Sequence, residues 1–573
     1  MSFTNLSSAS KQYGENGGIE YGWSYNIQEV ILQFYFQLVR TNAVQISLLE
    51  MKLRDILYFL KFTFLLDLNS IWKKYIILLY KLIGHTRDKI DGKGERDLTY
   101  MMISVWYDFF PELAFFALQC LNEPINNSPS YGCWKDMKYF CNYYKEKLGY
   151  NNHPLIIYCI QLINQQLKLD SHNYSINYSH NYSYNKNNSI SFIAKWIPRE
   201  NSKKFGWLFT FLAYDYFKDY IQSAQNQIST FNAQKKCKAE YRKLLSKLNN
   251  CLGTLEIKQC ARQWSTINFY HIPCIAINKQ TNTFLKNTCS NDRQLCKEKF
   301  ILFIENINRH SNQLVEIKEF TKKALQIISA NKNGFKQEQE EKILNKQWKF
   351  HSLLSPRLGN IIPVIDLSCT MVGEAYNTAI SLAIRIAEKS SIGKGIILSG
   401  STLKWINLGD TETFINCLKK IINHTHGTTS DLLGVFDMII NSMLDVKMSP
   451  QNIKNLTIVI ISDMQIMSFN KECFNEIIKT KFKDISFIPE IIFWNLRSTN
   501  GFPCISNECG FKMISGFNVN NLYYLTKDGK YTLGANNSWI LLERILNNNR
   551  YSILQSKSSK YLENYFCFSN KHD

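Results

Sequence analysis

The sequence predicts two parts of different fold class, a helical N-terminal part and a doubly wound α/β domain after it. In the first part, apolar side chains recur every three or four positions, as in Ile27, Val30 and Phe34, which is the period of an amphipathic helix. After Pro356, short apolar runs of strand length alternate with helical runs. A length of 573 residues also suits more than one domain. We therefore expect three segments, a flexible N-terminus over 1–25, a helical domain over 26–350 and an α/β domain over 351–573.

The helical part divides into two runs on either side of a low-complexity segment. Residues 1–25 are polar, and helical patterning extends over 26–165 and again over 206–349. Between these runs, residues 171–190 repeat the unit Asn-Tyr-Ser, which indicates a surface loop without stable structure. Many helices without a strand pattern are typical of a helical-repeat array of the solenoid (HEAT-like) type, although the sequence shows no clean repeat period.

The C-terminal part contains strand-like runs and the helices that separate them. The expected strands are the compact apolar runs 361–366, 395–399, 456–462 and 488–494. The expected helices are 372–389, 411–423, 431–444 and 470–479, with two more at 539–546 and 553–565. Strands that alternate with helices favour a mostly parallel sheet with helices on both faces.

Three oxygen-bearing side chains follow the first expected strand. Asp366, Ser368 and Thr370 form a D-x-S-x-[ST] pattern after the apolar run that begins at Ile361. A carboxylate and two hydroxyls on one short loop offer hard oxygen ligands to Mg²⁺ or Mn²⁺, which prefer octahedral oxygen coordination. This spacing resembles the first half of the metal-ion-dependent adhesion site of von Willebrand A domains.

Two later loops supply the remaining oxygen ligands in the same order. Ser430, which precedes Asp431 at a helix start, is the expected second-loop ligand, and Thr429 is the alternative. Asp463 follows the apolar run 456–462, and sites in α/β sheets collect at the carboxyl ends of parallel strands. Each residue by itself also fits a turn or a helix cap. The ordered set predicts a magnesium or manganese site with one position open to a partner's carboxylate or phosphate oxygen.

The positive charge is concentrated in the N-terminal part. Of a net charge of +20, residues 1–350 contribute +16, with 45 Lys and Arg against 29 Asp and Glu, and residues 351–573 contribute +4. Residues 201–300 alone carry 16 basic and 6 acidic side chains. Such an excess favours RNA or another polyanion as a partner. A solvated lysine-rich surface explains the same composition, because the Asn, Ile, Lys and Tyr content is typical of an A+T-rich protist or large DNA virus genome.

The sequence predicts an intracellular protein that does not enter a membrane. The polar start at Met1 lacks the basic and apolar segments of a signal peptide. The most apolar stretch, 56–66, is interrupted by Lys61 and is too short to cross a bilayer. Sixteen cysteines in a chain of this length form no dense disulfide framework. We therefore expect a cytoplasmic protein with free thiols, in the host cytoplasm or the virion if the chain is viral.

Several short motifs are spread over both parts of the chain. In the N-terminal part they are Arg87-Asp88, Gly92-Lys-Gly-Glu-Arg96, Tyr131-Gly-Cys-Trp-Lys-Asp136, Lys195-Trp-Ile-Pro-Arg-Glu200, Gln263-Trp264 and Ile272-Pro273. In the C-terminal part they are Ser462-Asp-Met-Gln465, Phe493-Trp-Asn-Leu-Arg497 and Ser515-Gly-Phe517. Together these motifs resemble the uncharacterised eukaryotic and viral family called domain of unknown function 2828, and the resemblance covers most of residues 26–550.

The resemblance implies a helical N-terminal half and a von Willebrand A-like C-terminal half with a metal site. Carried over to this chain, the metal ligands are Asp366, Ser368, Thr370, Ser430 and Asp463. More distantly, the chain resembles the TROVE (Ro autoantigen) family, which pairs a ring of helical repeats with a von Willebrand A domain and binds structured and misfolded RNA. Two positions depart from the usual pattern, since Thr370 stands where Ser is common and Ser430 where Thr is usual, which keeps Thr429 as an alternative.

A first basic group in the helical part is a candidate for contact with RNA. Arg87, Lys93 and Arg96 surround two glycines, and glycine lets a backbone approach a phosphate that arginine can grip in bidentate fashion. The acidic residues among them, including Asp88 and Glu95, favour instead ion pairs that join one helix to the next.

A second candidate combines basic and aromatic side chains. Lys195 and Arg199 flank Trp196, so an indole that stacks on a base would lie beside two cations for the phosphates. Burial of the indole between helices is the alternative, because tryptophan is usually well buried.

The sequence contains no motif typical of catalysis. The patterns G-x-x-x-x-G-K-[ST], G-x-S-x-G and H-E-x-x-H do not occur. We expect a non-enzymatic protein that binds RNA through its helical half and has a metal-dependent site in its C-terminal domain. The alternative is a scaffold whose metal site captures an acidic protein ligand without RNA. A metal-dependent hydrolase is the third possibility.

Overall fold

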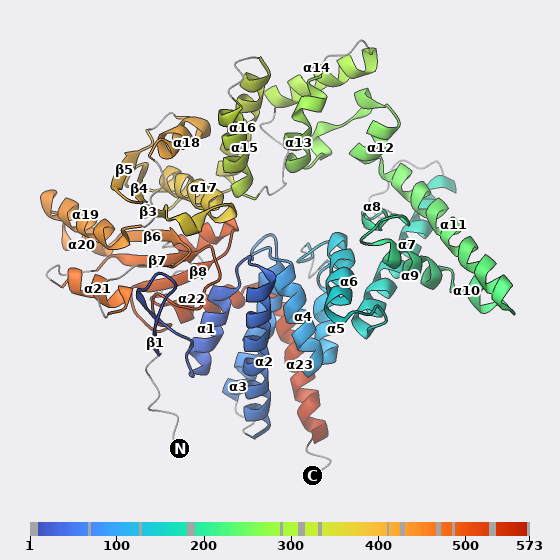
Figure 1. The fold of residues 1–573 in the computed structure, drawn as a ribbon, viewed down its shortest axis with the longest axis horizontal. Helices are drawn as coiled ribbons and strands as arrows, with labels where there is room; N and C mark the ends of the chain where they lie inside the picture. Colours follow the sequence, from blue (N-terminus) through green and yellow to red (C-terminus); the bar gives the residue numbers. More distant parts are fainter. Residues whose placement is uncertain are drawn as a thin grey trace. The chain divides into compact units, whose positions relative to one another are not determined.

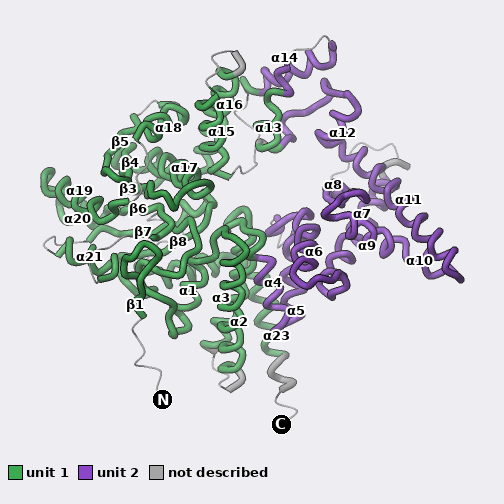
Figure 2. The backbone as a smooth tube through the Cα atoms, in the orientation of Figure 1, with its two compact units in different colours: residues 1–98, 273–282, 304–573 green, residues 99–272, 283–303 purple. Residues whose placement is uncertain are grey.

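The structure is a computed structural model, and it divides into two compact units (Figure 2). Unit 1 comprises residues 1–98, 273–282 and 304–573, and unit 2 comprises residues 99–272 and 283–303. Unit 1 contains a six-stranded sheet with helices and unit 2 is helical, so the predicted α plus α/β class is confirmed. The described residues are 10–66, 70–124, 129–179, 190–286, 290–306, 316–330, 335–409, 412–424, 430–465, 472–483, 488–526 and 535–569.

The sheet of unit 1 is mostly parallel (Figure 1). Its strands are β3 (Asn360–Asp366), β4 (Gly395–Ser399), β5 (Leu403–Asn407), β6 (Leu456–Ser462), β7 (Glu490–Asn495) and β8 (Phe511–Ser515). Their order across the sheet is β5-β4-β3-β6-β7-β8, and only the β4–β5 pair is antiparallel. The four predicted strands correspond to β3, β4, β6 and β7.

The sequence pattern does not predict β5 or β8. At the edge of the sheet, β5 leaves Lys404 and Trp405 exposed, so it lacks a continuous apolar run. The short strand β8 includes Lys512, whose Nζ lies 2.6 Å from Glu490 Oε1 on the neighbouring strand β7. In both strands a lysine interrupts the apolar pattern.

Between the two central strands, β3 and β6, the direction in which successive strands are added to the sheet reverses. Ile365 lies level with Ile461, so Asp366 and Ser462 reach the same carboxyl edge. From β3 the chain continues to β4 on one side, whereas β6, β7 and β8 lie on the other side. In open α/β sheets, ligands bind outside the carboxyl ends of the strands at such a reversal.

Helices before and after the strands complete the C-terminal part of unit 1. They are α15 (Lys318–Ser329), α16 (Phe335–Leu353), α17 (Glu374–Lys389), α18 (Phe414–Ile422), α19 (Leu432–Asp445), α20 (Pro450–Lys454), α21 (Phe474–Lys481), α22 (Ser538–Leu546) and α23 (Ser552–Ser569), with the 3-10 turns η5 (Cys369–Met371), η6 (Val519–Leu525) and η7 (Asn549–Tyr551). The predicted helices correspond to α17, α18, α19, α21, α22 and α23.

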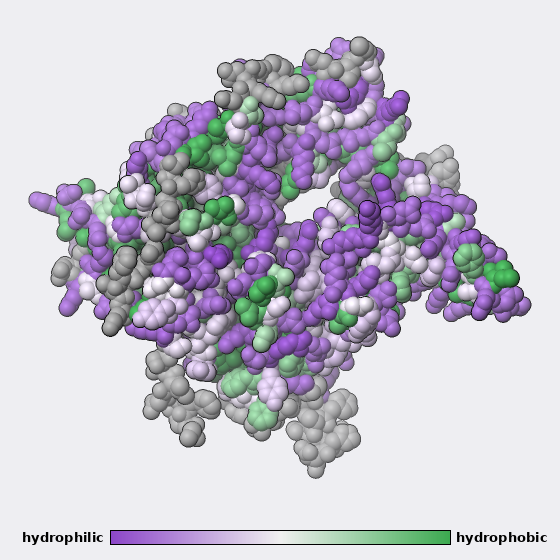
Figure 3. Space-filling model, viewed as in Figure 1, coloured by the Kyte–Doolittle hydropathy of each residue, from purple (hydrophilic) through white to green (hydrophobic). Residues whose placement is uncertain are grey.

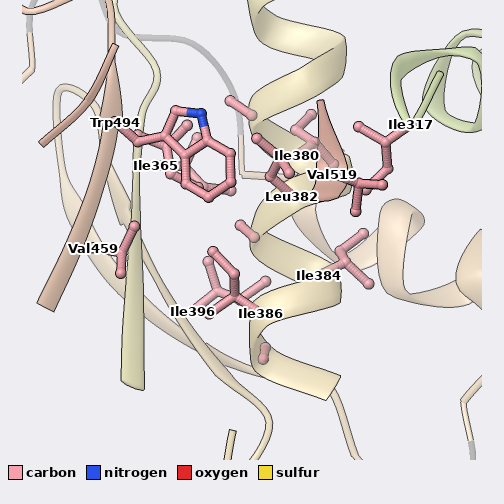
Figure 4. Close-up of a cluster of buried hydrophobic side chains, with 14 of the residues drawn as sticks. Ile317, Ile365, Ile380, Leu382, Ile384, Ile386, Ile396, Val459, Trp494 and Val519 are labelled. Atoms are coloured by element: carbon pink, nitrogen blue, oxygen red, sulfur yellow. The ribbon is translucent and has the colours of Figure 1, made fainter. Parts of the chain in front are cut away.

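Both faces of the sheet are buried, because successive side chains of a strand point to opposite sides. On one face, Ile365 and Trp494 belong to the hydrophobic core that also contains Ile384 of α17 (Figure 4). On the other face, the ring of Phe493 lies 6.0 Å from that of Phe474 on α21. Two-sided burial explains why the central strands are continuous apolar runs rather than alternating ones.

The N-terminal segment folds with the sheet in unit 1. It consists of β1 (Lys11–Tyr13), β2 (Ile19–Tyr21), α1 (Ile27–Gln37), α2 (Ala43–Leu66) and α3 (Ser70–Arg87). The strands β1 and β2 form an antiparallel hairpin, and Tyr21 exchanges backbone hydrogen bonds of 3.1 and 2.9 Å with Phe502. Within the expected flexible segment 1–25, residues 11–21 thus form a hairpin that distant contacts hold in place, and residues 1–9 lie outside the described part of the chain. The division into units likewise differs from the expected boundary between 350 and 351.

Lys93 joins the end of α1 to β8. Its buried ammonium donates to the carbonyls of Tyr35 and Leu38, the second at 3.1 Å, and to Ser515 Oγ at 2.7 Å. The last carbonyls of a helix have no partner within the helix, and Lys93 supplies donors for them. Burial lowers the pKa of Lys93 well below its ordinary value.

Unit 2 is built from helices that pack on helices close to them in sequence, as in a helical-repeat array. Its elements are α4 (Asp97–Phe109), α5 (Pro111–Gln119), α6 (Trp134–Leu148), α7 (Pro154–Ser179), α8 (Ile193–Trp196), α9 (Gly206–Tyr216), α10 (Lys218–Gln222), α11 (Gln227–Leu252), α12 (Leu255–Cys260), η3 (Trp264–Thr266), η4 (Phe269–His271) and α14 (Asn291–Glu305). One further helix, α13 (Cys274–Phe284), has residues in both units.

The predicted loop over 171–190 is partly helical. Residues 171–179 continue α7, and residues 180–189 lie outside the described part of the chain. Asp170 on this helix accepts a hydrogen bond of 2.6 Å from the Ser191 hydroxyl. This tertiary contact holds the end of the segment close to α7, which the Asn-Tyr-Ser composition does not reveal.

The visible surface is mostly hydrophilic, and its hydrophobic residues form small separate groups (Figure 3). Within the described residues, no helix is both long enough and apolar enough to span a bilayer. The described cysteines are free thiols.

We predict that Ile384→Ala destabilises unit 1 by about 2–5 kcal/mol, since Ile384 is fully buried between α17 and the sheet and its truncation leaves a cavity. Urea-induced unfolding measures the change. Val446→Ala is the control, because Val446 is 67% exposed and its truncation leaves no cavity. Equal destabilisation by the two substitutions would contradict the packing described here.

We also predict that Lys93→Met lowers the free energy of unfolding by about 2–4 kcal/mol, because two buried carbonyls and a hydroxyl lose their donor. Lys89→Met removes an exposed lysine four residues earlier and serves as the control. Denaturant titration of both variants gives the comparison. A Lys93→Met variant as stable as Lys89→Met would rule out this structural role.

Candidate functional site

The carboxyl ends of β3 and β6 bring together polar side chains from two loops. Ser462, the last residue of β6, donates a hydrogen bond of 2.6 Å to Asp366 Oδ2, and Asp366 Oδ1 accepts from Ser368 N at 2.9 Å. Asp366 is fully buried. Burial raises the pKa of Asp366, and the neighbouring Asp463 carboxylate adds to this effect. Both carboxylate oxygens are therefore held in fixed directions at the edge of the sheet.

The loop after β3 brings two hydroxyls together. Ser368 Oγ and Thr370 Oγ1 lie 2.9 Å apart and share a hydrogen bond. Ser368 is buried and Thr370 is half-buried. The loop then enters α17 through Gly373, whose φ of 94° lies in the left-handed region that glycine adopts without strain. Asp366, Ser368 and Thr370 thus form one hydrogen-bonded group.

The loop after β6 holds a second carboxylate beside the first. Asp463 is fully buried, and its Oδ1 accepts from Gln465 N at 3.3 Å. Met464, between them, has a φ of 63°, which is uncommon for a residue with a side chain and marks a tight turn. Asp463 Oδ2 lies 3.3 Å from Nη1 of Arg497, which follows β7.

Ser430 lies immediately before α19 and is half-buried. The next residue, Asp431, caps this helix, since its Oδ1 accepts from Gly434 N at 2.8 Å. In the described part of the chain, no hydrogen bond links Ser430 to Asp366 or Asp463. Thr429, the alternative second-loop ligand, falls outside the described residues. The structure therefore groups the first and third loops of the predicted set.

The grouped donors are carboxylate and hydroxyl oxygens, the ligand type that hard divalent cations prefer. No group of three or more His, Cys, Asp or Glu side chains among the described residues is placed to hold a metal ion. A cation at this edge would therefore depend on the hydroxyls of Ser368 and Thr370 in addition to the two carboxylates. The Arg497 guanidinium already neutralises part of the charge on Asp463.

The first basic group predicted to contact RNA is largely internal. Arg87 is fully buried and its Nη1 lies 3.4 Å from Gly94 O, and Lys93 is buried under α1 as described above. Arg96 is half-buried. A surface role for Arg87 and Lys93 is therefore wrong, because neither can reach a phosphate in the folded protein.

The carboxylates of this segment form ion pairs that join one helix to the next, which was the alternative to contact with RNA. Asp88 pairs with Arg550, whose Nη2 lies 2.6 Å from Asp88 Oδ1, and Glu95 pairs with Arg40 at 3.0 Å. These pairs join α3 and the following turn to the end of the chain and to the segment after α1. Asp88 and Glu95 thus connect segments within unit 1.

The second basic group has a different setting, on unit 2. Trp196 is half-buried, and the Nζ atoms of Lys135, Lys138 and Lys195 lie 5.2, 5.7 and 5.9 Å from the centre of its ring. Lys138 also lies 5.1 Å from the ring of Phe205. We call these five residues the Trp196 cluster. Its three ammonium groups come from α6 and α8, and its two aromatic rings come from α8 and from the residue directly before α9.

The lysines of the Trp196 cluster lie close to one another as well as to the rings. Lys195 pairs with Glu256 at 3.1 Å, but Glu256 is well exposed. Burial and the neighbouring Lys135 lower the pKa of Lys138, so its ammonium is poorly stabilised by its surroundings. Arg199, three residues after Trp196, is exposed. An anion bound here would relieve the repulsion between the ammonium groups.

Several residues of these sites stand out only in the folded chain. Ser462, Arg497 and Lys135 occur in the family-like motifs, but no pattern marks them as site residues. Phe205 has no local signal at all. Lys135 and Lys138 are three residues apart and therefore share a helix face, which is the one feature that sequence alone could have used.

Comparison with known proteins assigns two regions of the chain to families of unknown function. Residues 150–351 match the model of the domain of unknown function DUF2828, and residues 360–548 match that of DUF7788. The second match covers the strands of the sheet in unit 1.

One curated relative and one solved structure are similar over most of their length. The uncharacterized protein L728 of Acanthamoeba polyphaga mimivirus is 24% identical over 481 residues, which cover 78% of this chain and 76% of the relative. The crystal structure of the Deinococcus radiodurans Ro (RSR) protein aligns with 91% of this chain and 99% of its own, at 9% identity and a TM-score of 0.35. By sequence, the chain is therefore similar to the DUF2828 family over residues 150–351 and to the DUF7788 family over residues 360–548.

Proposed function

We propose that this protein is a non-enzymatic RNA-binding protein that contacts RNA through unit 2 and has a metal-dependent binding site at the carboxyl edge of its sheet. The observation that supports RNA binding most directly is the Trp196 cluster, where aromatic rings and ammonium groups share one partly exposed surface.

The charge distribution between the units supports the same proposal. Unit 2 contains 23 Lys and Arg against 13 Asp and Glu, a net charge of +10, which is half of the chain's net charge of +20. Unit 2 comprises only about a third of the residues. Phosphate groups are the natural counter-charges for such a surface, and the released counterions provide the driving force for binding.

The chemistry of the Trp196 cluster favours a nucleic acid over a simple acidic surface. An indole offers a flat face for a base, and this contact tolerates different sequences because every base has a π-face. The ammonium groups of Lys135, Lys138 and Lys195 would lie where the adjoining phosphates run. Arg199 is exposed nearby and could grip a phosphate in bidentate fashion.

The metal-dependent part of the proposal rests on the oxygen donors at the ends of β3 and β6. Asp366, Ser368, Thr370 and Asp463, with Ser430 or Thr429 from the second loop, would hold Mg²⁺ or Mn²⁺. A bound cation would supply a positive centre that captures a carboxylate or phosphate oxygen of a partner. The protein's own residues orient the donors, because Ser462 and the backbone of Ser368 fix the carboxylate of Asp366.

A metal-dependent scaffold without RNA binding is the second candidate function. The location of the oxygen donors at the reversal between β3 and β6 favours this function, because ligands bind at this position in α/β sheets. This argument does not depend on RNA binding by unit 2. A partner with an acidic side chain would then occupy the cation's open position. Loss of that partner on removal of the metal, with no effect of ribonuclease, distinguishes this function.

For the RNA proposal, we predict that the double variant Lys195→Glu/Arg199→Glu weakens binding to a structured RNA with an unpaired loop on the order of tenfold or more at low salt. Trp196→Ala should weaken it by about 5- to 150-fold, the effect of losing one stacked base. Wild-type affinity should fall steeply as salt rises from about 50 to about 200 mM. Fluorescence anisotropy with the full-length chain measures all three effects.

The matched control is Lys322→Glu/Lys349→Glu, which reverses two exposed lysines of unit 1 and changes the net charge equally. The full-length chain is used because a cut near residue 350 would separate α1–α3 from the sheet they fold with. If the control weakens binding as much as Lys195→Glu/Arg199→Glu, then net charge alone attracts RNA and the Trp196 cluster is not its site.

For the metal site, we predict that Asp366→Ala abolishes Mn²⁺ binding measured by isothermal titration calorimetry, because it removes the carboxylate around which the other donors are arranged. RNA affinity should stay unchanged, since the two sites lie in separate units. Asp431→Ala is the control, because Asp431 caps α19 through Gly434. Unchanged Mn²⁺ affinity in a folded Asp366→Ala protein would eliminate this metal site.

A further inference from the structure

The carboxyl edge of the sheet includes a cation that belongs to the protein. Nη1 of Arg497 lies 3.3 Å from Asp463 Oδ2, and Nη2 of the same guanidinium lies 3.3 Å from Glu15 Oε2. Arg497 therefore bridges a buried carboxylate of the proposed metal site and a carboxylate of the N-terminal hairpin. Asp463 is fully buried, whereas 39% of the Arg497 side chain and 46% of the Glu15 side chain are exposed.

The tip of the hairpin touches the same loop in two more places. Asn16 Nδ2 donates to Gln465 O at 2.9 Å, and Gln465 Nε2 donates to Glu15. Gln465 in turn donates its backbone N–H to Asp463. The hairpin tip and the loop that presents Asp463 are thus joined by side-chain and backbone hydrogen bonds.

The base of the hairpin is anchored independently of this contact. Lys11 Nζ lies 2.7 Å from Glu476 Oε2 on α21, and Tyr21 pairs with Phe502 through backbone hydrogen bonds. A substitution at the tip therefore changes the contact with Arg497 without releasing the hairpin from unit 1.

We propose that Arg497 sets the cation affinity of the site at Asp366 and Asp463, and that Glu15 controls Arg497. The inference rests on the metal site proposed above and adds two residues outside its proposed ligands. Arg497 competes with a divalent cation for Asp463, and Glu15 weakens that competition by holding the other side of the guanidinium.

Electrostatics gives the direction of each effect. Two cations that share one carboxylate repel each other, and this repulsion is strong where the carboxylate is buried and poorly screened. Arg497 therefore lowers the affinity for a divalent cation. When Glu15 loses its charge, Asp463 becomes the only carboxylate paired with Arg497 in the described structure, so the guanidinium competes more strongly. Neutralising Glu15 should then weaken cation binding, whereas neutralising Arg497 should strengthen it.

The test is a double-mutant cycle on the full-length protein, with Mn²⁺ alone as the probe and isothermal titration calorimetry as the measurement. Arg497→Gln should bind Mn²⁺ at least about tenfold more tightly than the wild type, as expected for removing one positive charge a few ångströms away. Glu15→Gln should bind it more weakly, by about threefold or more. Arg497→Lys keeps the positive charge and should stay close to the wild type.

The double variant Glu15→Gln/Arg497→Gln separates two ways in which Glu15 could act. If Glu15 acts through Arg497, the double variant should match Arg497→Gln, because there is no guanidinium left to control. If Glu15→Gln weakens binding equally in both backgrounds, Glu15 attracts the cation directly and the proposed control of Arg497 is overturned. Lys11→Gln is the control for the hairpin, since it removes an anchoring ion pair distant in sequence from Arg497 and should not change the affinity.

The outcomes also distinguish this inference from the metal site on which it rests. If the wild type binds Mn²⁺, Asp366→Ala abolishes binding and Arg497→Gln has wild-type affinity, then the site stands and the role of Arg497 is refuted. If neither the wild type nor Arg497→Gln binds Mn²⁺, the metal site itself is refuted, and the inference with it. Thermal unfolding of each variant shows whether a lost signal comes from a lost fold.

Discussion

The parallel pairing of β3 with β6 determines where unit 1 brings the polar side chains of its candidate site together. Six residue pairs hold the two strands in register from Asn360 with Leu456 to Ile365 with Ile461. Because the pairing is parallel, both strands deliver their last residues to the same edge, where Ser462 and Asp366 meet through a hydrogen bond. A shift of one residue would turn these side chains to the opposite face of the sheet. The two-sided hydrophobic core resists such a shift, because every strand residue near the edge is packed on one face or the other.

Unit 1 uses several of its charges inside the fold rather than on the surface. Lys93 closes the end of α1 and reaches β8, Asp88 pairs with Arg550 near the end of the chain, and Arg40 pairs with Glu95. Buried charges of this kind cost free energy unless they are paired or hydrogen-bonded, and each of these has such partners. The contacts of Lys93 with Ser515 and of Asp88 with Arg550 connect segments that lie hundreds of residues apart in sequence, which explains why the N-terminal helices fold with the C-terminal sheet. The basic residues of segment 1–98 are therefore a poor guide to a binding surface.

Unit 2 uses its positive charge differently. The lysines of the Trp196 cluster gather around an indole, and two of them come from one face of α6. Repulsion among these ammonium groups costs stability in the free protein, and an anion would reduce that cost. The proposed RNA contact and the proposed metal contact thus rely on opposite arrangements. One is a group of ammonium ions around aromatic rings, and the other is a buried pair of carboxylates whose charge is partly balanced by Arg497.

The sequence by itself determined the fold class, four of the six strands and the helices around them, because local periodicity encodes these elements. Short-range spacing likewise identified the candidate ligands Asp366, Ser368, Thr370 and Asp463. The sequence could not determine the edge strand β5, the N-terminal hairpin or the helical extension over 171–179, since distant contacts rather than local composition stabilise them. Nor could it show that Arg87 and Lys93 are internal while Trp196 is partly exposed among three lysines. Burial of a charged side chain depends on which distant carbonyls, hydroxyls and carboxylates surround it. Only the tertiary structure determines which groups lie beside such a side chain. The ion pairs of Arg497 with Asp463 and Glu15 are therefore visible only in the folded chain.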